Sequence, residues 1–389
     1  MEILQPKLRF SEFSKNWITK KLGEISIKIN SGKTPLGGES VYTEEGILFI
    51  RSQNVLDSKL SYDNSTFIDE KINNTMKNSI VKSNDILLNI TGASLGRSCV
   101  VPNDFIIGNV NQHVCIIRLN LENNSNYIQS ILASDNGQTR LKNLSTGSGR
   151  EGLNFQSIKN FEVYLPSLQE QTKIANFLSL VDEKLNLLKE KKTLLEDYKK
   201  GIMQKIFNQE IRFKDDNGND FEDWTFKSLG QVSIKESSSI SANKIEENFG
   251  DYIIYGASGV LKKVDFYLQE NDYISIIKDG AGVGRIFYCE GKTSVLGTME
   301  MIKPNKDINT YFLYCLLNNI DFTAFITGST IPHIYFKDYS KVKCGIPCYA
   351  EQTKIANFLS AIDEKIELVS NQIQDTQEYK KGLLQQMFV

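Results

Sequence analysis

Two stretches of the chain, residues 170–207 and 351–388, carry apolar residues at alternating steps of four and three. In the first stretch these positions are Ile174, Leu178, Val181, Leu185, Leu188, Leu195, Ile202 and Ile206, with Lys192 and Lys199 at the two remaining steps. In the second they are Ile355, Leu359, Ile362, Ile366, Val369, Ile373, Leu383 and Met387, with Thr376 and Lys380 at the polar steps. A seam of this period is typical of helices that pair in a coiled coil. We therefore predict two long helices.

These two stretches are copies of one sequence, offset by 181 residues. The segment from Glu170 to Ser179 returns unchanged from Glu351, and 20 of the 38 aligned positions are identical. The simplest partner for each helix is therefore the other copy. The seam allows either orientation; we expect an antiparallel coiled coil, which would give the chain an approximate two-fold axis.

Outside the helices the apolar residues form short runs separated by Asn, Ser, Thr and Gly, a pattern typical of strands joined by polar loops. Strands are predicted at residues 47–50, 85–90, 98–101 and 114–119, and a helix at 127–133. In the second half strands are predicted at 252–254, 273–277, 284–288 and 298–302, and a helix at 311–317. We predict an α+β protein with two α/β domains, 1–165 and 208–346, separated by helical spacers at 166–207 and 347–389.

Both halves also open and close alike, although their middles differ at most positions. Leu8, Arg9, Phe10, Trp17, Leu22 and Gly23 correspond to Ile211, Arg212, Phe213, Trp224, Leu229 and Gly230. A proline precedes each helix, at Pro166 and Pro347, where a preceding strand is expected to end. The chain is thus interpreted as a variable domain and a shared helix, each present twice.

Composition narrows the class of protein. Hydrophobic residues make up 40% and charged residues 24% of the chain, and no apolar run approaches the roughly 20 residues of a membrane span. The first residues do not form a signal segment, so we expect a cytoplasmic protein. The six cysteines are scattered and are interpreted as reduced, with no metal site expected. A net charge of −2 does not exclude DNA binding, because lysine and arginine can gather on one face.

A search for catalytic motifs gives little. Gly32-Lys33-Thr34 resembles the end of a phosphate-binding loop, but Ile27 stands where that loop needs glycine. Gly280-Ala281-Gly282-Val283-Gly284 could form a cofactor turn, yet a strand-like run follows where a helix is required. We interpret it, with its counterpart at 92–97, as a tight turn that places Arg97 and Arg285 at equivalent positions. The Pro-Pro motif of adenine methyltransferases and the Pro-Asp pair of restriction nucleases are missing, so no catalytic residue is predicted.

The helix motif Glu-Gln-x-Lys-Ile-Ala-x-x-Leu-x-x-x-Asp, which begins at Glu170 and again at Glu351, resembles the conserved regions of type I restriction–modification specificity subunits. Gly32-Lys33-Thr34-Pro35 followed by Gly46-Ile47-Leu48-Phe49-Ile50 is similar to the same family, as is Tyr255-Gly256-Ala257-Ser258-Gly259-Val260. The two halves use different early motifs, which suggests two dissimilar DNA half-sites.

The resemblance implies a non-catalytic DNA-binding subunit whose two target-recognition domains each read one half of a bipartite, asymmetric site. Two methyltransferase (M) subunits would dock on it and methylate adenine at N6 with S-adenosylmethionine. Two motor–nuclease (R) subunits, using ATP and Mg, would add restriction of unmodified DNA. The helices would set the spacing between half-sites and hold the M subunits.

Candidate DNA-reading residues are polar side chains in or beside loops that follow predicted strands, because paired donors and acceptors distinguish bases. In the first half they are Lys33, Arg51, Gln53, Asn54, Arg97, Asn111, Gln112, His113 and Arg150. In the second half they are Ser258, Lys278, Arg285, Thr298, Ser329 and His333. The lysines of the first helix (Lys189, Lys191, Lys192, Lys199 and Lys200) are interpreted as a solvated face.

Two alternatives stay open. A coiled-coil adaptor without DNA reading would show no sequence-dependent DNA protection, even with its partners present. A self-contained methyltransferase or nuclease is disfavoured by the missing motifs.

Overall fold

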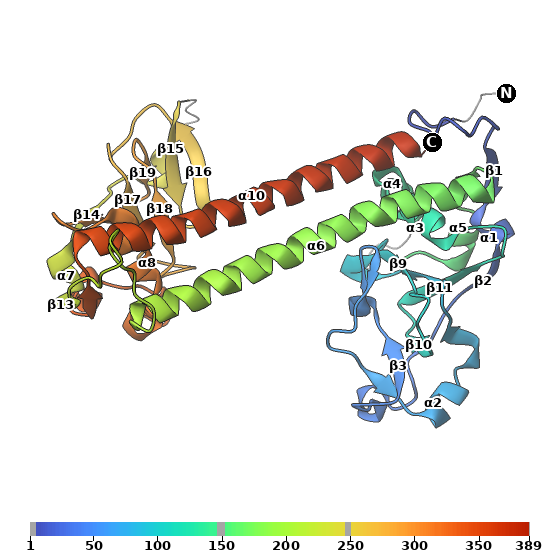
Figure 1. Cartoon of the computed structure of the whole chain (residues 1–389). Coiled ribbons are helices and arrows are strands. Elements are labelled where there is room, and N and C mark those ends of the chain that lie inside the picture. The colour runs from blue at the N-terminus through green and yellow to red at the C-terminus, as the bar shows by residue number, and fades with distance from the viewer. Residues whose placement is uncertain (1–4, 146–151, 246–249, 389) are drawn as a thin grey trace. The chain divides into compact units, whose positions relative to one another are not determined.

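The computed structural model describes residues 5–145, 152–245 and 250–388 (Figure 1). The chain divides into two compact units: unit 1 comprises Met1–Leu188 and Gln372–Val389, and unit 2 comprises Lys189–Asn371. The unit boundaries cut both long helices, α6 (Leu168–Phe207) and α10 (Tyr349–Met387). Each unit therefore contains one globule and a stretch of both helices.

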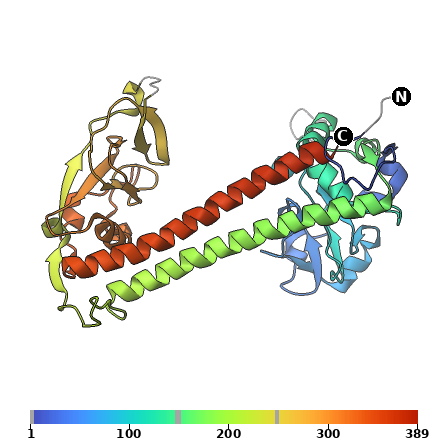
Figure 2. The same cartoon turned by 45° about the horizontal axis from the view of Figure 1, so that its top comes forward.

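Helices α6 and α10 begin two residues after Pro166 and Pro347, so the predicted helices are confirmed. Each has a glutamate in its first turn, Glu170 or Glu351, where the helix dipole favours negative charge. The predicted seam positions are buried or half-buried along both helices, as the period of their apolar residues requires. In unit 1 the last turns of α10 lie beside α6 (Figures 1 and 2), and Lys380 pairs with Asp182 there at 2.5 Å.

Unit 1 is built on two four-stranded sheets. The antiparallel sheet has the order β2 (Ser26–Ser31), β11 (Val114–Leu119), β8 (Ile86–Asn89), β9 (Ser98–Val100). The second has the order β6 (Phe67–Ile68), β3 (Ile47–Ile50), β10 (Gly108–Val110), β7 (Ile80–Val81). Strands β3 and β10 run parallel, whereas the other neighbours run antiparallel. Helix α3 (Ser125–Ala133) follows β11 and begins at the cap Asn124.

Unit 2 repeats the antiparallel sheet with different residues, and its second sheet has three strands in place of four. Its antiparallel sheet has the order β14 (Ser233–Ser237), β20 (Met299–Pro304), β17 (Tyr273–Ile277), β18 (Ile286–Cys289). Its second sheet has the order β16 (Gly259–Val264), β15 (Tyr252–Gly256), β19 (Ser294–Val295). The pair β15 and β19 is parallel, like β3 and β10. Helix α8 (Thr310–Asn318) corresponds to α3 and begins at the cap Asn309.

Each globule also contains a two-stranded sheet that pairs its first strand with its last. In unit 1, β1 (Ile18–Lys21) pairs with β12 (Glu162–Leu165), and in unit 2, β13 (Thr225–Ser228) pairs with β21 (Lys343–Ile346). The strands β12 and β21 end at the predicted domain boundaries, 165 and 346. The remaining helices and strands are α1 (Leu22–Ile25), α2 (Glu70–Asn74), α4 (Asp135–Leu144), α5 (Phe155–Lys159), α7 (Leu229–Val232), α9 (Phe336–Tyr339), β4 (Val55–Leu56) and β5 (Lys59–Leu60).

Each globule shares its main core with both long helices. In unit 1 the buried side chains of Ile174 and Leu178 from α6 and of Leu383 and Met387 from α10 belong to the core beneath the antiparallel sheet. In unit 2 the roles of the helices exchange: Ile355 and Leu359 come from α10, and Ile206 comes from α6. The seam therefore serves two purposes, since its residues also bury apolar surface against the globules.

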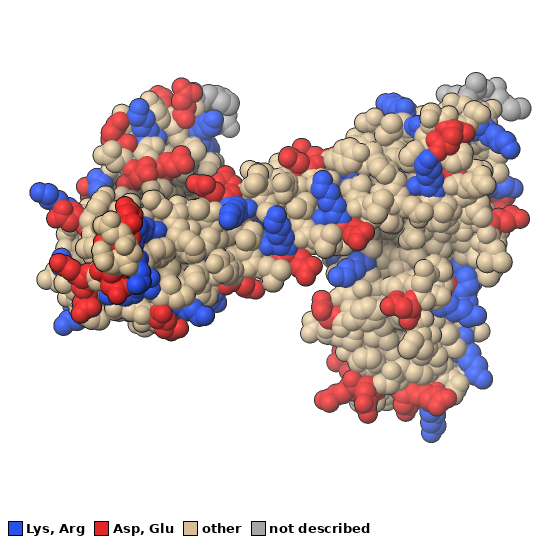
Figure 3. Space-filling model, viewed as in Figure 1, with Lys and Arg blue, Asp and Glu red and all other residues tan. Residues whose placement is uncertain are grey.

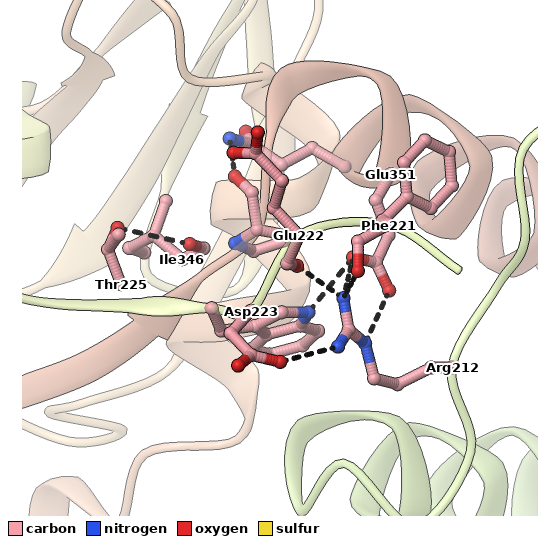
Figure 4. A network of polar contacts seen from close by, with 10 residues as sticks. Arg212, Phe221, Glu222, Asp223, Thr225, Ile346 and Glu351 are labelled. Carbon is pink, nitrogen blue, oxygen red and sulfur yellow. Dashed lines mark hydrogen bonds and ion pairs between the residues drawn. The ribbon is translucent and has the colours of Figure 1, made fainter. Parts of the chain in front are cut away.

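A buried glutamate anchors the opening segment of each half to the start of a long helix. In unit 2 the Arg212 guanidinium donates to both Glu351 carboxylate oxygens, at 3.2 and 2.9 Å, and to the Phe221 and Glu222 carbonyls (Figure 4). Trp224 Nε1 donates to the same carboxylate at 3.1 Å. The hydrogen bond with Glu351 raises the pKa of Arg212. In unit 1, Arg9 and Trp17 make the equivalent bonds to Glu170.

All six cysteines are free thiols, and five of them are buried. Burial raises the pKa of Cys99 and of Cys115 to about 12, so these thiols stay protonated at neutral pH. They pack as small apolar side chains, as predicted. Among the described residues, no helix has an apolar stretch long enough to cross a membrane.

Candidate nucleic-acid interface

The first-half candidates gather where the parallel strands of unit 1 end. Strands β3 and β10 pair Ile50 with Val110, so Arg51 and Asn111 leave the sheet at the same edge. The Asn111 N–H donates to the Ile50 carbonyl at 3.1 Å. Ligands commonly bind outside the carboxyl ends of parallel strands. In unit 1 the sheet has one such parallel pair, and Arg51 and Asn111 follow its two carboxyl ends.

Side-chain hydrogen bonds draw further candidate loops to this edge. The Thr34 hydroxyl, next to the exposed Lys33, donates to Gln112 Oε1 at 2.6 Å. The Gln112 amide lies 3.0 Å from His113 Nε2, and His113 Nδ1 lies 2.6 Å from the Thr91 hydroxyl. The structure thus brings together the loops at 32–35, 51–54, 91–97 and 111–113, which are far apart in sequence.

The candidates at this edge differ in the exposure of their side chains and in whether those side chains are hydrogen-bonded within the unit. Asn54 is 1% exposed, and its Oδ1 accepts from the Arg51 N–H at 3.0 Å. Asn111 is also buried, and its Oδ1 accepts from the His113 N–H at 3.0 Å. Gln53 is exposed and donates to the Asn64 carbonyl at 3.4 Å. Asn54 and Asn111 hold loops in place, and their contact with DNA stays a prediction.

A glycine turn occupies the same position in both units. Gly92 and Gly96 have φ of 76° and 89°, and Gly280, Gly282 and Gly284 have φ of 87°, 89° and 83°, values that favour glycine. The Asn89 N–H donates to the Arg97 carbonyl at 2.8 Å, just as the Ile277 N–H donates to the Arg285 carbonyl at 2.9 Å. The predicted equivalence of Arg97 and Arg285 is confirmed, and strands β9 and β18 follow the two turns.

Backbone pairing also gathers the second-half candidates. The Lys278 N–H donates to the Thr298 carbonyl, and the Ile334 N–H donates to the Lys278 carbonyl, both at 3.0 Å. Arg285 Nη1 donates at 3.3 Å to the carbonyl of Ala257, which precedes the exposed Ser258 in the β15–β16 turn. Thr327 and His333 pair through both of their N–H groups, and the exposed Ser329 lies in the loop between them.

The two loop clusters correspond position by position. The bond from Lys278 to Thr298 matches one from the Ile90 N–H to the His113 carbonyl at 3.0 Å, so His113 and Thr298 are equivalent. The bridge between Asp279 and His333 matches the bridge between Thr91 and Gly152. The candidate Arg150 lies outside the described residues.

Asn89 also shapes this edge, although no sequence pattern marked it as functional. Its side chain is fully buried, and Nδ2 donates to the Ser52 carbonyl at 2.9 Å and to the Ser94 hydroxyl at 3.2 Å. It therefore ties the loop after β3 to the glycine turn. The one available signal was that Asn89 interrupts the apolar run of residues 86–90.

On the face that Figure 3 shows, Lys and Arg side chains lie among Asp and Glu side chains on the unit 2 globule. On the unit 1 globule several Lys and Arg side chains follow one edge, and Asp and Glu side chains gather at its lower end. Base recognition by paired donors and acceptors does not need a uniformly basic face, although phosphate contacts need local positive charge.

The comparisons with known proteins agree with this architecture. The model of the type I restriction modification DNA specificity domain matches residues 14–197 and again 221–377. A putative type I restriction enzyme specificity subunit of Methanocaldococcus jannaschii is 23% identical over 97% of this chain and 94% of its own length. A putative type I specificity subunit of Mycoplasma genitalium is 24% identical over 81% of this chain and 82% of its own length.

Solved structures share the fold. The crystal structure of a type I restriction–modification system S subunit from M. genitalium matches with a TM-score of 0.67 and 20% identity, covering 99% of both chains. A chain from a structure titled for complex assembly and conformational transition of the type I R-M system matches with a TM-score of 0.55 and 16% identity, covering 96% of this chain and 97% of its own. With two matched specificity domains and relatives named as specificity subunits, the chain belongs to the type I restriction–modification DNA specificity family.

Proposed function

We propose that each unit reads one half of a bipartite, asymmetric DNA site through the loops at its parallel-strand edge. The observation that carries this proposal is the match between the two loop clusters. Backbone hydrogen bonds in the two clusters correspond, whereas the side chains differ, as Thr91, His113 and Asn89 in unit 1 against Asp279, Thr298 and Ile277 in unit 2 show. One scaffold that presents different donors and acceptors is suited to two dissimilar half-sites.

The chemistry belongs to partner subunits in this proposal. Two M subunits supply adenine-N6 methylation with S-adenosylmethionine, and two R subunits supply ATP- and Mg-dependent restriction of unmodified DNA. The chain itself is non-catalytic and acts in the cytoplasm. A structural relative whose title refers to assembly of the type I R-M complex supports a role in such an assembly.

The long helices pair as an antiparallel coiled coil in this proposal. Asp182 pairs with Lys380 in unit 1, and Lys199 pairs with Asp363 at 2.6 Å in unit 2. From the first ion pair to the second, the residue number rises by seventeen along α6, from 182 to 199. It falls by seventeen along α10, from 380 to 363. Such a register supports antiparallel pairing, and the two ion pairs are copies of each other under the 181-residue repeat.

Exposed apolar side chains on the helices support docking of two identical partners. Leu187 and Leu368, which are repeat equivalents, are 59% and 58% exposed. Tyr198 and Tyr379 are also equivalent and are 53% and 55% exposed. Because the two copies expose the same side chains, a partner that contacts one copy would find the same groups at the other.

The decisive test combines the purified chain with its M partner. The chain alone is expected to transfer no methyl group, and the complex is expected to methylate adenine in one bipartite motif. Genome-wide methylation mapping measures this directly. Methyl transfer by the lone chain would contradict the non-catalytic assignment, and a complex without sequence preference would favour the adaptor alternative.

The role of the helices as a spacer is tested by lengthening both. Seven residues inserted after Lys192 and after Val369 face each other in the register set by Lys199 and Asp363, and they preserve the heptad seam. One heptad adds roughly 10.5 Å, about three base-pair steps. A variant that remains active is expected to methylate the same half-sites with a longer gap. An unchanged gap would show that the helices serve only to dock partners. Loss of activity would agree with the rotation of roughly 100° that three base pairs introduce.

A further inference from the structure

Arg51 is held in a fixed position at the parallel-strand edge of unit 1. It follows the last residue of β3, where its N–H donates to Asn54 Oδ1 at 3.0 Å and its carbonyl accepts from the Asn54 N–H at 2.8 Å. Its guanidinium carbon lies 5.9 Å from the centroid of the Tyr42 ring, and Tyr42 packs in turn against the buried Phe49. The backbone and the head group of Arg51 are therefore both positioned before any ligand arrives.

No residue that the structure describes accepts a hydrogen bond from the Arg51 guanidinium. Arg51 Nε is buried, and it has no hydrogen-bond partner among the described residues. A buried donor without a partner loses its hydration and gains nothing in return, which is costly for a charged group. Asn89 Oδ1 is also buried without a partner, and the Asn89 amide contacts the carbonyl of Ser52, the residue after Arg51. Two unsatisfied polar groups thus flank the start of one loop.

The other described arginines are used differently. Arg9, Arg118 and Arg212 donate to buried carboxylates, with Arg118 held by both oxygens of Asp85. Arg140 and Arg285 donate to backbone carbonyls. Arg97 is exposed, so water solvates its guanidinium. Arg51 therefore combines partial burial with a guanidinium that no described residue occupies, an arrangement that suits an acceptor on a ligand.

We propose that Arg51 is a specificity-determining residue that reads a guanine in the half-site bound by unit 1. This inference rests on the proposed function. Guanine O6 and N7 form a pair of acceptors that matches the guanidinium fork. Phosphate contacts position a protein without reading sequence, and an exposed, mobile side chain suffices for them. The packing on Tyr42 and the capped loop instead fix the direction of the fork, which is what discrimination between bases requires.

The inference also predicts which half-site is affected. Val295 pairs with Tyr255 in the parallel strands of unit 2 as Val110 pairs with Ile50 in unit 1, so the position equivalent to Arg51 is Gly256. Glycine carries no donor there beyond its backbone. Replacement of Arg51 is therefore expected to change one half of the methylated motif and to leave the other half intact.

The test compares Arg51→Ala and Arg51→Lys in the complex with the M subunits, after thermal unfolding has shown that each variant folds. Lysine keeps the charge but loses the two-pronged fork. If Arg51 reads guanine, both variants relax the motif at one G·C position, with discrimination falling roughly tenfold to hundredfold. Tyr42→Ala is expected to weaken the same position, whereas Tyr42→Phe keeps the ring and retains discrimination. Arg140→Lys, in α4 and outside the loop cluster, is the control that leaves the motif unchanged.

Three results would overturn the inference while leaving the proposed function in place. The first is a half-site for unit 1 that contains no G·C pair. The second is an unchanged motif in Arg51→Ala. The third is evidence that Arg51 contacts a phosphate. In that case Arg51→Ala would lose affinity equally for all sequences and would lower the salt slope by about one, and Arg51→Lys would retain the wild-type affinity. The proposed function fails separately, if the wild-type complex shows no sequence preference.

Discussion

Units 1 and 2 attach their globules to the long helices through the same residue types. Their loops at the parallel-strand edge carry different residues. In both, a buried glutamate of the repeated block accepts from an arginine and a tryptophan of the opening segment. In both, a glutamine next to that glutamate, Gln171 or Gln352, donates to the proline carbonyl five residues before it. The shared Glu-Gln pair at the start of each helix is thus explained by contacts at the junction of globule and helix.

At the parallel-strand edge the equivalent contacts are made by different side chains. The carbonyl after the edge position belongs to Ser52 in unit 1 and to Ala257 in unit 2. Asn89 donates to the first from the end of β8, and Arg285 donates to the second from beyond the glycine turn. In both units the carbonyl at this position accepts a side-chain hydrogen bond, but a different residue donates it. Arg97 and Arg285 are both exposed, but the guanidinium of Arg285 also donates to a carbonyl of its own unit.

This contrast indicates that the contacts that fix a globule to the helices are separate from the loops that are proposed to read DNA. Contacts that hold a globule to the helices come from the opening segment, which donates to the buried glutamate, and from the main core, which contains side chains of both helices. The variable polar side chains lie in the loops that follow the carboxyl ends of β3 and β15. Exchanging one globule should therefore alter one recognition surface without disturbing the shared attachment.

The largest expected effect follows from such an exchange. Replacing residues 1–165 with the first domain of another family member keeps Glu170 and the rest of α6. Half of the methylated motif is expected to change and the other half to stay, as methylation mapping of the complex can show. A motif that changes in both halves would contradict independent reading. The matched control exchanges residues 208–346 and is expected to alter the other half.

Removing a glutamate anchor is expected to destabilise its own unit by about 1–3 kcal/mol, because the arginine and the tryptophan lose a charged acceptor. Glu351→Ala leaves Arg212 and Trp224 without their acceptor in unit 2, and Glu170→Ala does the same to Arg9 and Trp17 in unit 1. Hydrogen exchange should show the loss of protection in one unit per variant. Glu351→Gln, which keeps an acceptor for Trp224, should lose less. Equal loss in both units would contradict separate anchoring.

The sequence predicted those parts of the fold that depend on local patterns. The strands at 47–50, 114–119 and 273–277 and the two long helices match the structure, because apolar period and flanking residues decide them. The anchors were missed although Arg9, Trp17 and Glu170 and their counterparts all recur, since a heptad pattern draws attention to apolar positions. Strands β1 and β13 were missed too, because four half-polar residues become a strand only when a distant segment pairs with them.

Candidate loop residues were predicted less well for a related reason. Asn54 and Gln53 are adjacent and both polar, yet one is buried under hydrogen bonds to Ser61 and Asp63 and the other is exposed. Which side of a loop faces outward depends on contacts with residues far along the chain. The correspondence of Arg51 with Gly256 likewise emerges only from the register of parallel strands that are dozens of residues apart.

Smaller effects are expected for the two equivalent turn arginines, and their environments should separate them. Arg97→Ala removes an exposed guanidinium, and a lost phosphate contact would weaken binding of all sequences alike and lower the salt slope by about one. Arg285→Ala also frees the Ala257 carbonyl, so it is expected to disturb the Ser258 turn and the half-site read by unit 2. Binding measured over a salt series with matched and mismatched DNA distinguishes the two. If neither variant alters affinity or specificity, the turns have only a structural role.

The smallest effects concern the ion pairs between the long helices. Asp182 accepts from Lys380 in unit 1, and Asp182→Asn is expected to cost about 0.2–1 kcal/mol, because both side chains are partly exposed. Asp363 accepts from Lys199 in unit 2 and also from the hydroxyl of Tyr311. Burial raises the pKa of Tyr311, and the bond to Asp363 raises it further, so the hydroxyl stays a donor.

Asp363→Asn is therefore expected to cost more than Asp182→Asn, by about 1 kcal/mol, since a hydrogen bond to a charged group is weakened along with the pair. Denaturant unfolding of both variants measures the difference. A double-mutant cycle with Tyr311→Phe assigns it, because the coupling vanishes if the tyrosine does not contribute. The cost of Asp182→Asn should fall in high salt more completely than that of Asp363→Asn, because salt screens exposed charges and leaves a half-buried hydroxyl bond in place. If the two substitutions cost the same free energy and high salt removes both costs equally, the Tyr311 hydroxyl of α8 adds nothing. The ion pair would then contribute equally in the two units, although α3 and α8 differ in sequence.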